Sequence, residues 1–328
     1  MRLRLTSGTV GTEKGVASNF PDTDILSRIG NTPLLRLAKV STECPGVSLF
    51  AKAEWFNPGG SVKDRPALNM ILEGERTGPL TRSKILLDAT SGNTGIAYAM
   101  IGAVRGYRVR LVVPENIGYE RKRILEAYGA ELVFSNAREG SDGAIALARK
   151  MAANDPTLYF YPDQYSKPAN WQSHYKTTAM EIYLQTQKHV THCVAGMGTS
   201  GTFTGIGRRL KALIPGVRVI AMQPESPMHG LEGMKHYASS IIPAIYDSGL
   251  ADRFVEVSTE EAQLMVKRLA CEEGLLAGIS AGGNVAAALK VGKGLKSGTV
   301  VTVLCDGGMK YMSERFWDNG KRNHSIES

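Results

Sequence analysis

Lys63 is the first residue whose position in the chain could support chemistry. It follows the glycine turn of residues 58–60 and precedes an apolar run that we expect to form a helix ending near Gly78. Ser61 and Asp64 have the spacing of a variant capping box at the start of this helix. The electropositive start of a helix disfavours a cation, and a neutral lysine can form a Schiff base. A solvated surface lysine is the competing interpretation.

Three loops of small residues could bind anions. Each follows an expected strand and precedes an expected helix, which is the edge where open α/β sheets bind ligands. Each also presents hydroxyls and backbone N–H groups. One such loop is more often a tight turn than a site, but three of them together with Lys63 predict a phosphorylated cofactor and a carboxylate substrate in one cleft. The loops are residues 90–95, 196–202 and 278–284.

The second loop also matches a different motif. Gly196, Gly198 and Gly201 have the spacing of the dinucleotide-binding fingerprint, and Glu225 follows the next expected strand. This match leaves an NAD-dependent oxidoreductase open as an alternative. The acidic residue arrives later than the ~20 residues that the motif requires. The alternative also explains neither Lys63 nor the first loop.

Strands and helices alternate along the chain, which predicts an α/β fold. Continuous apolar strands favour parallel sheets covered by helices on both faces, and the alternation divides near residue 155 into two runs. After a short helix, turn and strand in residues 24–40, the expected strands are residues 47–54, 84–90, 109–114, 131–135, 192–196, 218–223 and 299–305. Besides the Lys63 helix, the expected helices are residues 96–104, 120–128, 143–153, 170–187, 204–214, 259–273 and 284–290.

Composition narrows the class of protein. The 328 residues can form two modest domains. The net charge is +8, but the sequence has no basic run interleaved with aromatic residues. We therefore expect small anions rather than nucleic acid as partners. No stretch approaches the ~20 apolar residues of a membrane span. The cysteines are too widely spaced for a disulfide or zinc framework, which predicts buried free thiols, no metal site and a cytoplasmic protein. They are Cys44, Cys193, Cys271 and Cys305.

The motifs together resemble the cysteine synthase and cystathionine β-synthase family, which comprises pyridoxal-phosphate enzymes of fold type II. The resemblance runs from about Ile29 to Ser313 and rests on residues 57–66, 90–95, 198–202 and 278–280. It implies two three-layer α/β domains with mostly parallel sheets, like those of tryptophan synthase β. The implied organisation is a flexible N-terminus (1–20), a larger cofactor-binding domain (21–53 and 156–328) and a smaller mobile substrate-binding domain (54–155).

The resemblance implies a role for each matching residue. Lys63 matches the lysine that holds the cofactor and takes the Cα proton, and Asn93 matches the asparagine that bonds the cofactor's 3′-oxygen. Ser280 matches the serine facing the pyridine nitrogen, a neutral partner that leaves the ring a weaker electron sink than aspartate would. The residues matching the phosphate cradle are Gly198, Thr199, Ser200, Gly201 and Thr202, of which Ser200 replaces the usual glycine. The residues matching the substrate-carboxylate site are Thr90, Ser91, Gly92, Thr94 and Gln164.

The implied reaction is β-replacement on an activated L-serine, through an α-aminoacrylate, with sulfide added to give L-cysteine. The donor is O-acetylserine or O-phosphoserine. Lys235 falls in the entrance loop where phosphoserine-using relatives have an arginine, so it is a candidate phosphate-binding residue. Cystathionine β-synthase, a diaminopropionate-precursor synthase and a non-catalytic binding paralogue stay open as alternatives. The family also implies a homodimer that acts on small molecules, with no nucleic acid or membrane partner.

Overall fold

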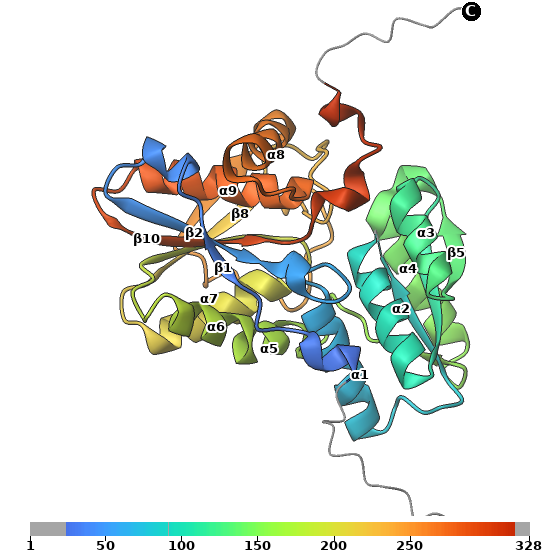
Figure 1. Cartoon of the computed structure of the whole chain (residues 1–328). Helices are drawn as coiled ribbons and strands as arrows, with labels where there is room; N and C mark the ends of the chain where they lie inside the picture. Colours follow the sequence, from blue (N-terminus) through green and yellow to red (C-terminus); the bar gives the residue numbers. More distant parts are fainter. Residues whose placement is uncertain (1–23, 91, 319–328) are drawn as a thin grey trace, which may run out of the picture.

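The computed structural model describes residues 24–90 and 92–318, which form two α/β lobes that face each other (Figure 1). The larger lobe has a six-stranded sheet in the order β1-β2-β10-β7-β8-β9, and the smaller has four strands in the order β5-β4-β3-β6. Only the pairing of β1 with β2 is antiparallel among these named strands. The expected α/β class with mostly parallel sheets is confirmed. The segment expected to be flexible, residues 1–20, lies outside the described residues.

Most of the strands carry the apolar runs that the sequence predicted. In the larger sheet they are β1 (Leu34–Arg36), β2 (Val47–Ala53), β7 (His192–Gly196), β8 (Arg218–Pro224), β9 (Arg253–Val257) and β10 (Gly298–Leu304). In the smaller sheet they are β3 (Ile85–Ala89), β4 (Arg108–Pro114), β5 (Glu131–Ser135) and β6 (Tyr159–Phe160). The smaller sheet therefore extends to Phe160, five residues beyond the end expected for the smaller domain.

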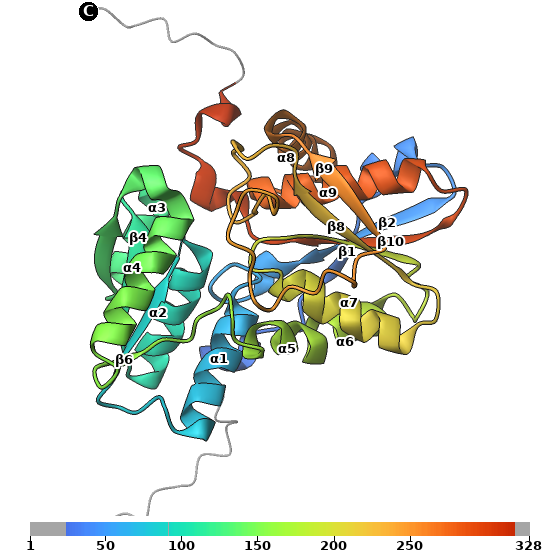
Figure 2. The ribbon, with the colours of Figure 1, turned by 180° about the vertical axis from the view of Figure 1, so that it is seen from behind.

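Helices cover both faces of both sheets. In the larger lobe α8 and α9 lie on one face and α5, α6 and α7 on the other (Figures 1 and 2). In the smaller lobe Leu86 of β3 packs into the core under α2, whereas Leu87 packs under α4, because successive strand residues point to opposite faces. The helices are α1 (Asp64–Thr77), α2 (Asn93–Arg105), α3 (Tyr119–Ala127), α4 (Gly140–Asn154), α5 (Ala169–Lys176), α6 (Thr178–Gln185), α7 (Gly201–Leu213), α8 (Thr259–Glu273) and α9 (Ile279–Lys293).

Several expected elements differ from the structure. The single helix expected over residues 170–187 breaks at Thr177, whose hydroxyl donates to the Ser173 carbonyl over 2.7 Å, a bond of the kind that bends helices. The short strands β6 and β9 were not expected. Helix α9 begins at Ile279 rather than at residue 284, because its small residues are buried against α8 and the larger sheet, and that packing outweighs their low helix propensity.

The expected capping box at the start of α1 is wrong. The helix begins at Asp64, and Lys63 is the flanking residue, without a side-chain cap. Gly60 has a φ of 75°, and beyond this bend the Asp64 carboxylate accepts a hydrogen bond from the Gly59 N–H at 2.5 Å. Ser61 forms an isolated bridge with Asp306 and accepts from the Lys63 N–H at 3.2 Å. The glycine bend therefore uses both groups that the capping box required.

The cysteines are all unpaired, as the spacing predicted, but they are not all buried. Cys44 and Cys193 are buried, whereas Cys271 is exposed on α8, so the expectation of buried thiols is wrong there. Within residues 24–90 and 92–318 no cluster of side chains could hold a metal ion. The same residues include no helix that is both long enough and apolar enough to cross a membrane.

Candidate functional site

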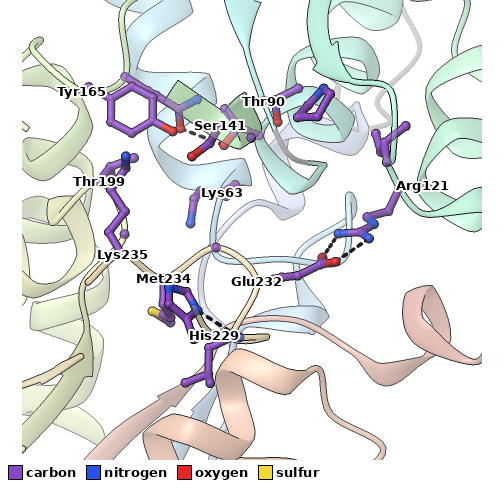
Figure 3. Close-up of a pocket in the computed structure, with 18 of the residues that line it drawn as sticks. Lys63, Thr90, Arg121, Ser141, Tyr165, Thr199, His229, Glu232, Met234 and Lys235 are labelled. Atoms are coloured by element: carbon purple, nitrogen blue, oxygen red, sulfur yellow. Dashed lines mark hydrogen bonds and ion pairs between the residues drawn. The ribbon is translucent and has the colours of Figure 1, made fainter. Parts of the chain in front are cut away.

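A cavity of about 340 Å³ lies between the two lobes, at the carboxyl ends of both sheets. Lys63 lies on its wall, and Figure 3 shows the Lys63 amine between Thr199 and Lys235 on one side and Arg121 and Glu232 on the other. Seven of the predicted site residues line this cavity. They are Lys63, Thr90, Thr94, Gln164, Gly198, Thr199 and Lys235.

A smaller recess of about 20 Å³ adjoins Lys63 on the side of the larger lobe. It is lined by the predicted cradle, residues 198–202, at the start of α7. The first helical hydrogen bond here runs from the Thr204 N–H to the Ser200 carbonyl at 2.8 Å, so the N–H groups of residues 201–203 have no carbonyl of their own helix to bind. Such N–H groups at a helix start bind phosphate readily.

The glycines of this cradle are required by close packing. A Cβ at Gly198 would lie 2.0 Å from the Gly233 carbonyl oxygen, and one at Gly201 would lie 2.0 Å from Oδ1 of Asn170. Ser200 adopts a left-handed conformation with a φ of 66°, which costs a residue other than glycine about 1–2 kcal/mol. A glycine at this position would avoid that cost.

The predicted carboxylate-binding residues form one hydrogen-bonded group at the end of β3. The Thr90 hydroxyl accepts from the N–H groups of Gly92 and Gly95 at 3.0 and 3.1 Å. The Thr94 hydroxyl donates to Gln164 Oε1 at 2.9 Å, and Gln164 Nε2 donates to the Ala89 carbonyl at 2.8 Å. These bonds fix the two hydroxyls on the cavity wall. Ser91 lies outside the described residues.

Asn93 and Ser280 are not among the residues that line the cavity. The Asn93 amide donates to Asp306 and accepts from Lys310 Nζ, each over 2.7 Å. Ser280 is the second residue of α9 and is 5% exposed, next to the Cys305 thiol. Burial raises the pKa of that thiol to about 11, so it is protonated at neutral pH.

Three titratable groups near Lys63 have pKa values shifted from their usual range. Burial raises the pKa of Asp64 to about 7, although its hydrogen bond from Gly59 and the charge of Lys310 oppose the shift. Burial also lowers the pKa of Lys310 below its usual value. For His174, burial and then the charge of Arg65 hold the pKa well below its usual range, so this ring is neutral beside Thr202, with 3.3 Å between Nε2 and the hydroxyl.

A buried ionic network joins the start of α1 to the larger lobe. Arg65 donates to Glu54 at 2.7 Å and to Glu181 at 2.6 Å, and Lys52 lies 2.6 Å from Glu181. Arg65, Glu54 and Lys52 have side chains at most 1% exposed. Because α1 carries Arg65 and the other three residues belong to the larger lobe, this network fixes the start of α1 against that lobe.

Two ion pairs connect the lobes at the cavity. Arg121 of α3 binds Glu232 (Figure 3), and Lys235 binds Asp142 of α4 at 2.6 Å. Lys235 Nζ also lies 5.6 Å from the centre of the Tyr165 ring. The charge of Lys235 is therefore compensated by a carboxylate of the smaller lobe.

Sequence reasoning gave no role to several residues at the site. Cys305 and Asp306 directly follow β10, and the rule that ligands bind at the carboxyl ends of parallel strands could have found them. Arg121 and Glu232 meet only through the tertiary fold, 111 residues apart, and no local pattern marks them. Lys310 reaches Asn93 in the same long-range way.

Comparisons with known proteins agree on one family. Residues 25–306 match the family described as pyridoxal-phosphate dependent enzymes. The chain is 46% identical to the cysteine synthase of Aquifex aeolicus over 295 residues, which cover 88% of this chain and 90% of that protein. A cysteine synthase structure from Entamoeba histolytica superposes with a TM-score of 0.85 at 32% identity, covering 97% of this chain and 94% of that one. An O-acetylserine dependent cystathionine β-synthase from Helicobacter pylori gives a TM-score of 0.84 at 34% identity, covering 90% and 98%.

Proposed function

Because the chain belongs to the family of pyridoxal-phosphate dependent enzymes, we propose that it makes L-cysteine by β-replacement on an activated L-serine with sulfide. The observation that carries the proposal is the position of Lys63. Its side chain lies where the recess at the start of α7 meets the cavity walled by Thr90 and Thr94. One amine can therefore reach both a cofactor held by its phosphate and the Cα atom of an amino acid.

The residues present fit the cofactor. The start of α7 presents backbone N–H groups for a phosphate, and the packing of Gly198 and Gly201 allows the backbone to approach it closely. The neutral His174 ring beside Thr202 contributes no charge to this site. Ser280 at the start of α9 offers a neutral hydroxyl for the ring nitrogen. When bound, pyridoxal phosphate supplies the electron sink that makes the Cα proton of the substrate acidic.

The remaining steps use side chains of this chain. We assign to the Lys63 amine the removal of the Cα proton, which must precede loss of the β-leaving group. Thr90, Gly92, Thr94 and Gln164 hold the substrate carboxylate, and Ser91 is assigned with them from the motif. The Thr90 hydroxyl accepts two backbone N–H bonds, which leaves its own proton available for the carboxylate, whereas Thr94 must release its bond to Gln164 before it can donate. Lys235 is assigned to the leaving group as a point charge.

The domain organisation and assembly rest on the resemblance. We propose that the smaller domain, residues 54–155, moves relative to the larger one, residues 21–53 and 156–328, when substrate binds. We also propose a homodimer in the cytoplasm. Light scattering on the purified protein tests the dimer, and a mass equal to one chain, 35.4 kDa, would contradict it.

A donor and nucleophile survey tests the reaction. The reconstituted enzyme is given O-acetylserine or O-phosphoserine together with sulfide or homocysteine, and the amino-acid products are separated. Cysteine formed from sulfide and at least one of the two donors is the expected result. Cystathionine formed faster than cysteine would reassign the nucleophile, and no product from any pair would overturn the proposal. The NAD-dependent alternative is set aside because the family uses pyridoxal phosphate.

A further inference from the structure

The two ion pairs at the cavity share an unusual distribution of exposure. The side chains of Arg121 and Lys235 are 5% and 8% exposed, whereas their partners Glu232 and Asp142 are 38% and 36% exposed. In each pair the cation is buried at the cavity and the carboxylate reaches solvent. A carboxylate with access to water can leave the pair at small cost, but the buried cation then needs another anion.

Arg121 is held in place by groups other than Glu232. Its guanidinium carbon lies 5.3 Å from the centre of the Tyr311 ring. The backbone packs closely around the side chain, since a Cβ at Gly92 would lie 2.6 Å from its Cδ and one at Gly118 would lie 2.5 Å from Nη2. The guanidinium therefore keeps its position at the cavity when its partner changes.

Glu232 presents a carboxylate to Arg121 in the geometry that an external anion would use. Nη1 and Nη2 of Arg121 each donate to a different oxygen of Glu232, the second over 2.9 Å. This forked arrangement suits carboxylates and phosphates equally. Glu232 and Arg121 both line the cavity that contains Lys63.

We propose that Arg121 is an anion-binding residue of the active-site cavity and that Glu232 is its displaceable internal counterion. The phosphate of an O-phosphoserine donor takes the place of the Glu232 carboxylate, which moves into solvent. No covalent bond forms or breaks in this exchange. The identity of the anion as a donor substrate rests on the proposed function, whereas the exchange itself does not.

Binding of inorganic phosphate to the holoenzyme tests the exchange without relying on activity. The cofactor is kept bound so that its own phosphate occupies the cradle at residues 198–202. Glu232→Gln removes the competing charge and is expected to tighten phosphate binding about tenfold, as measured by calorimetry. Glu225→Gln removes the same charge from an exposed position seven residues earlier and is expected to leave binding unchanged. The double variant Arg121→Gln, Glu232→Gln is expected to lose the increase in phosphate affinity that Glu232→Gln alone produces.

Unchanged or weaker phosphate binding in Glu232→Gln would overturn the proposal. If the Arg121–Glu232 pair only held the lobes together, removing the Glu232 charge would loosen the lobes without raising the affinity for phosphate. An equal gain in phosphate affinity in Glu225→Gln would also overturn the proposal, because the gain would then come from the change in net charge alone. Failure of the proposed function is a separate outcome. If no donor yields cysteine but Glu232→Gln binds phosphate more tightly, the exchange stands and the reaction is wrong. If cysteine is made but phosphate affinity does not change, only the exchange is wrong.

Discussion

The Asn93 amide and the Asp306 carboxylate join the two lobes through a hydrogen bond of 2.7 Å between residues 213 positions apart. Lys310 completes the arrangement by donating to the other side of the same amide and to the Gly60 carbonyl in the bend before Lys63. Because one partner accepts and the other donates, the orientation of the Asn93 amide is fixed. The segment after β10 thus links the predicted 3′-oxygen partner to the lysine loop.

The first prediction concerns Lys310. Lys310→Met removes the donor to Asn93 and to the lysine bend, so we expect the cofactor to bind about tenfold more weakly, in line with the loss of a charge-assisted hydrogen bond. We also expect the visible absorption of bound cofactor to shift, because Asp306 alone then holds the Asn93 amide. Affinity is measured by titrating the cofactor-free protein. Lys296→Met, at an exposed position, is the control. Equal cofactor affinity in the two variants would show that Lys310 does not contribute to cofactor binding.

The second prediction concerns Asp64. Its pKa is raised by burial to about 7, above the value of about 4 in an unfolded chain, so the folded state holds the proton more tightly between these pH values. The free energy of unfolding therefore falls as the pH rises from about 4 to 7. Asp64→Asn keeps an acceptor for the Gly59 N–H, and we expect the variant to lose less stability over this range. Urea unfolding at pH 5 and pH 8 measures this, and identical pH dependence in the two proteins would refute it.

The third prediction concerns the ionic network under α1. Burial opposes ionisation of Glu181, but the hydrogen bond and charge of Arg65, followed by those of Lys52, outweigh it and lower the pKa to about 2. Its stabilising contribution is present above the unfolded pKa of about 4.3 and is lost as the pH falls through about 2. We expect Glu181→Gln to lower the free energy of unfolding at pH 7 by about 3–5 kcal/mol, because buried Lys52 and Arg65 lose a counter-charge.

Urea unfolding of a matched variant separates burial from charge. Glu126→Gln removes a carboxylate that is 41% exposed and paired with Lys122 and Arg123 on α3. We expect it to change the free energy of unfolding by less than about 1 kcal/mol, as for other surface pairs. A Glu181→Gln effect as small as this control would show that the network does not stabilise α1.

The local parts of the site could be predicted from the sequence, and the long-range parts could not. The Lys63 bend, the loop after β3 and the cradle before α7 are each a strand, a turn and a helix start, and turn and helix signals are local. By contrast, the Arg121–Glu232 and Asn93–Asp306 contacts exist only after the lobes are packed. The break at Thr177 was missed because apolar periodicity continues through it. Strand β9 was missed because it is a short edge strand with three of its five residues exposed, so it lacks a regular apolar alternation.

Reduction followed by peptide mapping tests most directly whether Lys63 carries the cofactor. Borohydride makes the lysine–cofactor bond permanent, and mass spectrometry of a digest then identifies the modified lysine. We predict one adduct on the peptide that contains Lys63, no adduct in Lys63→Ala, and a fall in kcat of at least about 10³-fold in that variant. An adduct on Lys310 or Lys52, two other lysines near the start of α1, would contradict this assignment, as would normal turnover by Lys63→Ala.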